Sequence, residues 1–380
     1  MYKISKFVSH EFRKNAGNEV SKLRLLIAGA KPKFFHLKEF GDALAKIGVE
    51  YKLVHDLDVY TGFPSKDIRK WFQTRKKFNA LVSEFKPDAV FIDRQAHFGL
   101  ATIKANIPLF ILLRGDYWSE MKWAKETLYK SLIKRAVLWW KQRIAENCFS
   151  GAAVILPICK YLEPIVKDHY PKKSVKVLYG GIDFSRWYPV KEMELKHPCV
   201  GLLQGAWIWG KTKEILTLTK VIESMPNVTF YWAGDGPYRQ KITDVLDKYD
   251  NFKWLGALEY PDKVRQYLTA LDVYALASGI DMSPLTLQEA QLMRKPVVAT
   301  NAGGIPELMM DKETGFLVEK GDYEDWIKKL TLLINDNKLA ETMGNAGREF
   351  IEENFSWEKM AENFLDIVND NLKNKRTKIE

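Results

Sequence analysis

Short apolar runs alternate with longer amphipathic segments along most of the chain. Each run is short enough for a buried strand, and they fall at 23–28, 51–54, 89–92, 109–113, 153–156, 175–178, 200–203, 229–233, 252–255, 273–276 and 296–299. The segments between the runs are long enough for helices, as at 36–46, 262–271, 338–354 and 356–371. This alternation predicts an α/β protein whose parallel sheets are covered on both faces.

Two successive series of strands predict two domains. The chain has 380 residues, of which 46% are hydrophobic, and this is enough for two cores of ordinary size. We place the first domain at 1–190, the second at 191–355 and a closing helix at 356–380. A polar stretch at 187–198 is the expected linker, and an arm at 1–21 precedes the first strand.

The most specific chemistry of the chain lies around two carboxylates, Asp281 and Glu289, which stand eight positions apart. Pro284 between them is placed to start a helix. The first amides of that helix, those of Leu285 and Thr286, lack partners within it and can receive phosphate oxygens. Glu289, one turn further on, suits two vicinal hydroxyl groups because a carboxylate accepts from both. The pattern predicts a site for a sugar nucleotide.

This segment resembles the signature region of the family 4 retaining glycosyltransferases. Further motifs of that family lie on both sides of this segment, in the family's order: LYGGIDFSRWYP (178–189), GAWIWGK (205–211), AGDGP (233–237), FKWLG (252–256), GGIPE (303–307) and TGFLVEKGD (314–322). The resemblance implies the GT-B fold, in which two Rossmann-like domains have parallel sheets facing each other across a cleft. It also implies that the first domain binds the acceptor, that the second binds the nucleotide sugar, and that the last helix crosses back onto the first domain.

The resemblance implies roles for individual residues as well. Donor binding would involve Gly205, Lys211, Gly234, Asp235, Leu258, Ser283, Pro284, Leu285, Thr286 and Glu289. The catalytic group would consist of Asp281, Glu289 and Arg114. Lys211 would neutralise the diphosphate as its bond to the sugar breaks, because a flexible ammonium follows that charge easily.

Three positions depart from the family's usual pattern. Ala206 stands where a second cation usually follows the glycine, Asp281 replaces a glutamate, and Arg114 replaces a histidine. An arginine stays protonated, so Arg114 can hold a phosphate but cannot act as a base. His97 and Asp116 are the other titratable groups nearby in the sequence, and His97 suits a structural role equally well.

We expect neither a metal ion nor a bound cofactor, and the nucleotide-diphosphate sugar is treated as a substrate. If the acceptor hydroxyl attacks the face from which the diphosphate departs, the phosphate itself takes the proton, and catalysis rests on positioning and charge. Asp56 and Asp58 have the D-x-D spelling of metal sites in other transferase folds. We interpret them as a solvated strand end.

The charge pattern suggests a membrane partner. The chain carries a net charge of +10, and the excess of basic residues lies in its first half. Within 121–147, apolar side chains recur at helical spacing, and seven basic residues stand among them: Lys122, Lys125, Lys130, Lys134, Arg135, Lys141 and Arg143. An amphipathic helix with tryptophan and basic side chains is attracted to an anionic membrane surface. A Lys-rich solvated helix is the alternative, and we expect no nucleic-acid partner because no binding motif for one is visible.

We expect a cytoplasmic protein, peripheral at the inner face of the membrane. No apolar run approaches the ~18 residues of a membrane span, and the N-terminus lacks the apolar region of a secretory signal. Three cysteines without metal-ligand spacing are typical of a reducing compartment.

These observations predict a retaining glycosyltransferase that uses a UDP- or GDP-sugar. The expected acceptor is a hydroxyl of a lipid-linked glycan or a cell-envelope precursor. Two alternatives remain open: a sugar-nucleotide epimerase of GT-B layout, and a non-catalytic, membrane-associated partner of a glycosyltransferase.

Overall fold

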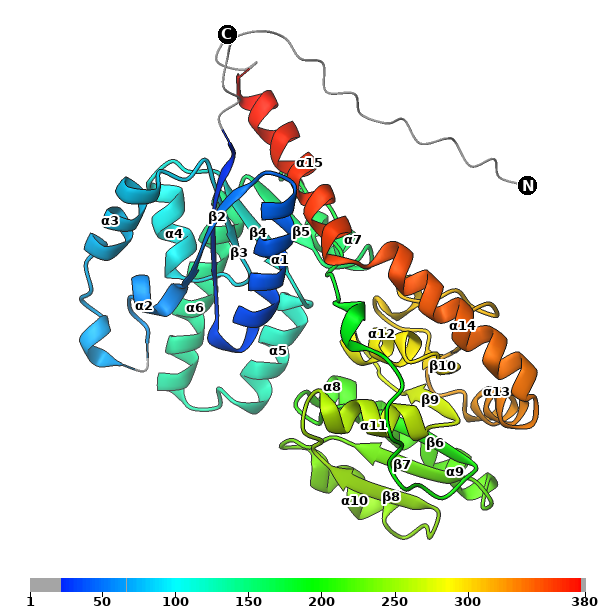
Figure 1. The fold of residues 1–380 in the computed structure, drawn as a ribbon. Helices are drawn as coiled ribbons and strands as arrows, with labels where there is room; N and C mark the ends of the chain where they lie inside the picture. Colours follow the sequence, from blue (N-terminus) through cyan, green and yellow to red (C-terminus); the bar gives the residue numbers. More distant parts are fainter. Residues whose placement is uncertain (1–21, 66, 377–380) are drawn as a thin grey trace, which may run out of the picture.

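The chain builds two α/β units, one above the other in Figure 1, with the last helix running from one to the other. The structure is a computed structural model that describes residues 22–65 and 67–376. The arm expected at 1–21 lies outside the described residues. None of the helices in the described part is both long enough and apolar enough to cross a bilayer.

The N-terminal unit, here called the N-domain, contains a parallel five-stranded sheet of order β2-β1-β3-β4-β5. Its strands are β1 (Arg24–Gly29), β2 (Glu50–His55), β3 (Ala89–Ile92), β4 (Leu109–Leu113) and β5 (Val154–Pro157). One face packs against α1 (Phe34–Lys46) and α15 (Trp357–Arg376). The other packs against α4 (His97–Lys104) and α6 (Leu132–Gly151). Because both faces are covered, β3, β4 and β5 are apolar throughout rather than alternating, whereas the edge strand β2 carries Glu50 and Lys52.

The second unit, the C-domain, has a parallel six-stranded sheet of order β11-β10-β9-β6-β7-β8. Its strands are β6 (Cys199–Leu203), β7 (Thr229–Ala233), β8 (Phe252–Gly256), β9 (Val273–Leu276), β10 (Val297–Thr300) and β11 (Gly315–Val318). The helices α9 (Leu218–Ser224), α10 (Arg239–Leu246) and α13 (Tyr323–Asn335) cover one face. The helices α11 (Asp262–Ala270), α12 (Leu285–Leu292) and α14 (Asn337–Asn354) cover the other.

Helix α15 leaves the C-domain and packs on the N-domain sheet (Figure 1). Its Phe364 is fully buried among the rings of Phe40, Phe91 and Phe110, with centroid distances of 5.4, 5.2 and 5.5 Å. Three edge-on aromatic contacts in a dry core bind this helix firmly. The C-terminal segment therefore contributes to the core of the first domain.

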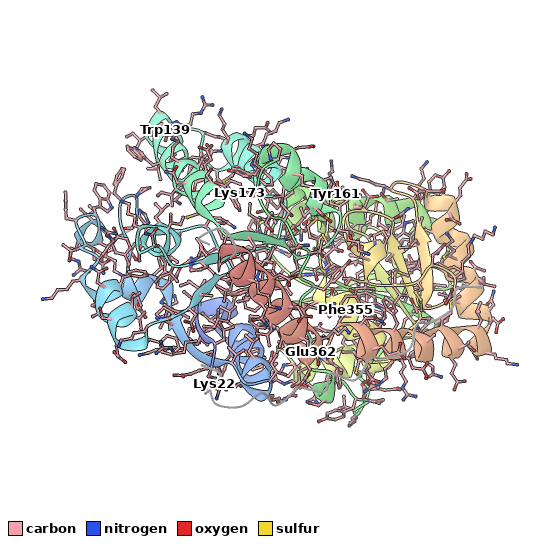
Figure 2. The ribbon with its side chains drawn as sticks, turned by 90° about the horizontal axis from the view of Figure 1, so that it is seen from above. Lys22, Trp139, Tyr161, Lys173, Phe355 and Glu362 are labelled. Atoms are coloured by element: carbon pink, nitrogen blue, oxygen red, sulfur yellow. The ribbon has the colours of Figure 1, made fainter. Side chains whose placement is uncertain are left out.

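A single carboxylate makes a second link between the domains. Glu307, the last residue of the GGIPE motif of the C-domain, accepts hydrogen bonds from the backbone amides of Lys160 and Tyr161 at 2.7 and 2.8 Å. It also accepts one from the Tyr179 hydroxyl at 2.7 Å. Tyr161 and Phe355 both lie where the two domains meet (Figure 2). These bonds, together with α15, set how the two sheets face each other.

Three sequence expectations are wrong in detail. The run 175–178 is not a strand, since only Val175 forms an isolated bridge, with Ile155, before the chain turns into the linker. The segment 121–147 is not one helix but parts of two, α5 (Tyr117–Thr127) and α6. The break occurs because the Ser131 hydroxyl accepts from the Lys134 amide and so caps a new helix start.

The third error concerns the D-x-D sequence. Asp56 is not solvated: it is 3% exposed, begins the short helix α2 (Asp56–Val59) and pairs with the guanidinium of Arg94. Its neighbour Asp58 is exposed. The two carboxylates therefore have different environments, and Asp56 already has a cation as partner.

Candidate active site at the domain cleft

The carboxyl ends of both sheets border a cavity of about 150 Å³ between the domains. Parallel α/β sheets bind ligands at this end because the connecting loops and helix starts gather there. The N-domain contributes Lys33, His36 and Arg114, the C-domain contributes Lys211, Asp281, Ser283 and Leu285, and α15 contributes Trp357 and Met360. The structure thus brings together five of the residues predicted from the sequence, namely Arg114, Lys211, Asp281, Ser283 and Leu285.

Two of these residues form an ion pair. The ammonium of Lys211, in the short helix α8 (Trp209–Thr212), donates to Oδ1 of Asp281 at 2.7 Å. Both side chains are only partly exposed. Without a ligand, therefore, the expected diphosphate ligand and the first acid of the signature loop neutralise each other.

Two further cations approach the cavity from the N-domain. Lys33 stands in the turn after β1, and burial, followed by the nearby Arg114 charge, lowers the pKa of its ammonium; Asp93 opposes this shift, and Lys211 adds to it. Arg114 is itself largely buried, and its Nε atom has no hydrogen-bond partner. A partly desolvated group of three cations, of which Asp281 pairs with only one, suits an anion.

Lys33 is not among the site residues predicted from the sequence. A signal for it existed: a basic residue directly follows the carboxyl end of a parallel strand, where ligands bind. Ala206, where the resemblance places a second cation, is buried and does not line the cavity, so the additional positive charge there comes from the N-domain.

The start of α12 borders the same cavity. Pro284 is the N-cap, so the helix begins at Leu285, and the first amides of the helix have no partner within it. The hydroxyl of Thr286 is turned toward the sheet and lies 2.9 Å from the Tyr274 hydroxyl. Its backbone amide, rather than its side chain, is therefore the group suited to an anion.

Glu289 lies one turn further along α12 and is 3% exposed. Burial raises the pKa of its carboxyl group to about 8, and a hydrogen bond from the Tyr260 hydroxyl, at 3.3 Å, opposes that shift. A carboxylate here gains from additional donors, because each hydrogen bond to the charged form compensates for the lost water. Vicinal hydroxyl groups of a ligand would supply such donors.

The glycine loops after β6 and β7 pack on each other. The Ala206 amide donates to the Asp235 carbonyl at 2.9 Å. Gly234 has a φ of 155°, and a Cβ atom there would lie 2.0 Å from the Gln204 carbonyl oxygen, so only glycine fits. Seven of the predicted donor-binding residues lie outside the lining of the cavity: Gly205, Gly234, Asp235, Leu258, Pro284, Thr286 and Glu289. Leu258 packs against the core.

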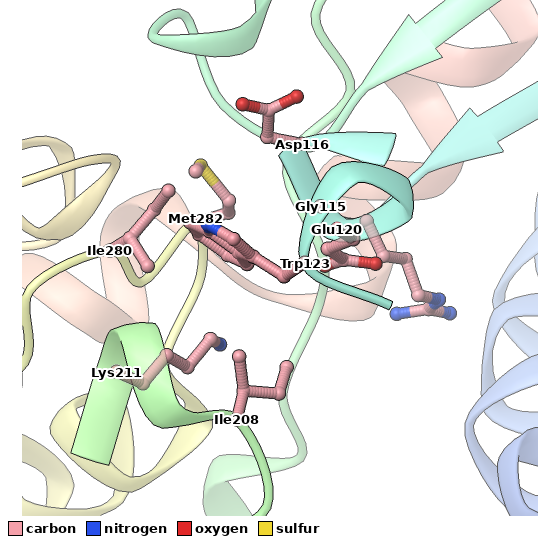
Figure 3. Close-up of a pocket in the computed structure, with 9 residues that line it drawn as sticks. Gly115, Asp116, Glu120, Trp123, Ile208, Lys211, Ile280 and Met282 are labelled. Carbon is pink, nitrogen blue, oxygen red and sulfur yellow. The ribbon is translucent and has the colours of Figure 1, made fainter. Parts of the chain in front are cut away.

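A smaller cavity lies beside the first, and a tryptophan of the N-domain closes it. Figure 3 shows Trp123 of α5 reaching toward Ile280 and Met282, with Lys211 and Ile208 on its other side. A Cβ atom on Gly210 would lie 3.0 Å from the Trp123 ring, so the two domains are in contact here. Glu120, which burial gives a raised pKa, lines the same space. Neither residue was predicted from the sequence.

The two remaining titratable candidates have structural contacts. Asp116 caps α5 by accepting from the Ser119 amide at 3.2 Å. The Nε2 atom of His97 lies 2.8 Å from the Phe63 carbonyl oxygen, and burial lowers the pKa of this imidazole. One group of His, Cys and carboxylate side chains in the described part could hold a metal ion: His197, Cys199 and Asp272. It lies at the amino ends of β6 and β9, away from the cleft.

The architecture matches solved glycosyltransferases of the GT-B fold. The sucrose-phosphate synthase of Thermosynechococcus elongatus superposes with a TM-score of 0.69 at 14% identity, covering 93% of this chain and 100% of that one. HepE of Anabaena, solved with UDP-glucose, superposes with a TM-score of 0.65 at 16% identity, covering 92% and 100%. The chain therefore has the GT-B fold.

Residues 210–350 match the family model of the glycosyl transferases group 1. An uncharacterised glycosyltransferase of Methanocaldococcus jannaschii is 27% identical over 209 residues, which are 54% of this chain and 56% of that protein. A GDP-mannose-dependent mannosyltransferase of Corynebacterium glutamicum, which acts on a monoacylated phosphatidylinositol monomannoside, is 34% identical over 170 residues, 42% of this chain and 43% of that protein. The chain thus spans about half the length of these relatives. The region that the family model matches, 210–350, contains Lys211, Asp281 and Glu289.

The buried Glu289 predicts an inverse dependence of stability on pH. Its carboxyl group has a higher pKa in the folded chain than in the unfolded one, so its contribution to stability is lost as the pH rises from about 4.5 to about 8. The uncharged variant Glu289→Gln should gain free energy of unfolding relative to the wild type as the pH rises from 5 to 8.5. We expect a relative change of at least ~1.4 kcal/mol, the equivalent of one pKa unit. Urea unfolding at both pH values measures it, and a constant difference would contradict the burial argument.

Proposed function

We propose that the protein is a retaining glycosyltransferase of family 4 that transfers a sugar from a UDP- or GDP-sugar to an acceptor hydroxyl. One observation carries the proposal: three cations from two domains, Lys33, Arg114 and Lys211, line one cavity with the start of α12. The buried Glu289 lies one turn behind that start. A diphosphate beside a ribose combines the anion and the vicinal hydroxyls that these groups suit. HepE binds UDP and UDP-glucose, and the Corynebacterium relative is named for GDP-mannose, which supports such a donor.

In the proposed mechanism the cations stabilise the departing diphosphate. Lys211 exchanges its bond with Asp281 for one with phosphate, which leaves the Asp281 carboxylate available to the hydroxyl groups of the sugar. The acceptor attacks from the face that the diphosphate leaves, and a phosphate oxygen takes the proton from the acceptor hydroxyl. No metal ion or bound cofactor is needed, because Lys33, Arg114 and Lys211 supply the positive charge.

The positions of the cations favour an enzyme over a non-catalytic partner. Lys33 and Arg114 compensate for the two departures at Ala206 and at the replaced histidine, since both approach the cavity from the N-domain. Holding partly buried cations together without an anion costs stability. A chain that had lost its donor would gain by replacing them.

We further propose that the acceptor is a lipid-linked or cell-envelope glycan precursor, and that the protein works in the cytoplasm at the inner membrane face. Leu132 and Ile133 at the start of α6 are 83% and 80% exposed, and Trp139 and Trp140 are about half exposed. Trp139 lies at the outer edge of the N-domain (Figure 2). Basic residues surround these apolar ones, which favours an anionic bilayer.

Removal of the buried carboxylate tests the donor site. Glu289→Ala should lower turnover of the UDP- or GDP-sugar substrate on the order of 10²-fold, because the hydroxyl contacts in the cleft are lost. Release of UDP or GDP in the presence of acceptor measures it. The exposed Glu313→Ala in the same domain is the control, with unchanged turnover expected. Equal rates for the wild type and Glu289→Ala would exclude the proposed donor site.

A pair of lysines tests the contribution of the N-domain. Lys33→Ala should weaken binding of UDP or GDP about tenfold, a loss of ~1.4 kcal/mol that is typical for one charged contact. Lys31→Ala, two positions earlier and exposed, should bind like the wild type. Isothermal titration measures both variants. If the two variants bind alike, the N-domain does not contact the diphosphate.

Flotation with lipid vesicles tests the membrane contact. The wild type should float with vesicles containing phosphatidylglycerol and not with pure phosphatidylcholine, and salt should weaken the association because it screens the surface charge. Replacing both Trp139 and Trp140 with alanine should reduce flotation several-fold. Trp207→Ala, which removes an exposed tryptophan from the C-domain, is the control. Equal flotation with phosphatidylglycerol-containing and with pure phosphatidylcholine vesicles would contradict the proposal.

A further inference from the structure

A large groove in the N-domain lies outside the cavity that Lys33, Arg114 and Lys211 line, which is called here the donor cavity. Its volume is about 670 Å³, within the range of ordinary ligand sites. One wall is formed by the chain after β2, including Pro64 and Trp71, and the floor by the turn after β3 at Arg94 to His97. The opposite wall consists of Tyr117 and Met121 of α5 and Val137 and Ile144 of α6. This groove, called here the N-domain groove, has no role in the donor chemistry described above.

Helix α5 separates the N-domain groove from the cleft. Tyr117 and Met121 line the groove, whereas Glu120 and Trp123 line the small cavity beside Lys211. Arg114, just before this helix, lines the donor cavity itself. A ligand in the groove would therefore lie one helix away from the site where a sugar would be transferred.

The chemistry of the groove is that of an amphiphile site. Its walls are largely apolar, and the charged groups on them are mostly cations: Lys70, Arg94 and Lys141. The Arg94 charge is balanced by the buried Asp56, and the one lining acid, Asp67, is held by Arg69 at 3.0 Å. The two lysines thus leave the groove with an excess of positive charge beside an apolar wall.

Exposed apolar side chains from two distant segments surround the groove. Phe72, two residues after the short turn Ile68–Lys70, is 87% exposed, and Ile68 is 65% exposed. The ring of Phe63 joins this segment to α6, since it lies 4.8 Å from the Trp71 ring and 5.6 Å from the Trp140 ring. Trp71 belongs both to this aromatic group and to the groove wall. The groove is therefore continuous with the surface proposed above to face the membrane, and that surface includes a second set of residues, 63–65 and 67–72.

We propose that the N-domain groove holds the apolar carrier chain of an anionic amphiphilic acceptor, which enters from a bilayer lying against residues 67–72 and the start of α6. This inference rests on the proposed function, because it assigns the acceptor side of the same reaction. The apolar wall takes the chain, Lys70 and Lys141 attract the phosphate of the carrier, and the hydroxyl to be glycosylated lies toward Tyr117 and the cleft. A water-soluble glycan without a carrier leaves the apolar wall unoccupied.

The test uses n-dodecyl phosphate below its micelle concentration, with the full chain, and follows tryptophan fluorescence, to which Trp71 contributes. Saturable binding is expected, and inorganic phosphate should give no saturable change. Val137→Glu places a charge on the groove wall and should weaken binding about tenfold or more. Ala136→Glu adds the same charge to the same helix one position earlier, at an exposed site, and should bind like the wild type.

Three outcomes would overturn the proposal. Equal binding of dodecyl phosphate by Val137→Glu and Ala136→Glu would show that the ligand lies elsewhere. If dodecyltrimethylammonium binds as tightly as dodecyl phosphate, the lysines do not attract the ligand. If inorganic phosphate binds as tightly as dodecyl phosphate, the apolar wall does not contribute. A thermal shift with UDP or GDP, measured on the same variants, shows whether the fold and donor site are intact. If the wild type shows no thermal shift with UDP or GDP, only the proposed function is contradicted. Failure of the groove proposal and failure of the proposed function are therefore distinguishable.

Discussion

The bonds of Glu307 across the domain boundary are the constraint on which the rest of the site depends. Its carboxylate accepts from two backbone amides at the start of the segment after β5 and from the Tyr179 hydroxyl. Burial and Glu307 together raise the pKa of Tyr179, so the phenol remains a donor at every physiological pH. Charged acceptors make stronger hydrogen bonds than neutral ones. Helix α15 adds a second, apolar attachment through Phe364, and the two together hold the carboxyl ends of both sheets toward one another.

That arrangement creates an imbalance of charge in the cleft. Lys33 and Arg114 come from one domain and Lys211 from the other, while Asp281, the carboxylate that lines the same cavity, is already bound to Lys211. Burial raises the pKa of Asp93, and the charge of Arg114 opposes that shift. Such a site is costly when empty and is relieved by an anion, and this difference in free energy favours ligand binding.

Helix α5 borders two separate spaces, the contact between the domains and the N-domain groove. Trp123 points into the domain contact, and Met121 points into the N-domain groove. Movement of this short helix would change both spaces at once. Its start is fixed by the Asp116 cap, and Ser131 fixes the start of α6, so the connection between the helices carries the exposed Leu128 outward. The same local breaks that shape the groove also expose the apolar residues next to it.

The sequence by itself determined most of the strands and the start of α12, although the run 175–178 is not a strand and β11 has no counterpart among the predicted runs. The predicted runs 89–92, 109–113, 229–233 and 273–276 coincide with β3, β4, β7 and β9, because a strand covered on both faces must be apolar at every position. Pro284 and Leu285 also have local signals for a helix start. Only the tertiary structure decided that Lys33 reaches the cleft, that Asp56 is buried against Arg94 and that Phe63 contacts α6. Each depends on a partner far away in the chain, and neither periodicity nor capping contains information on such partners.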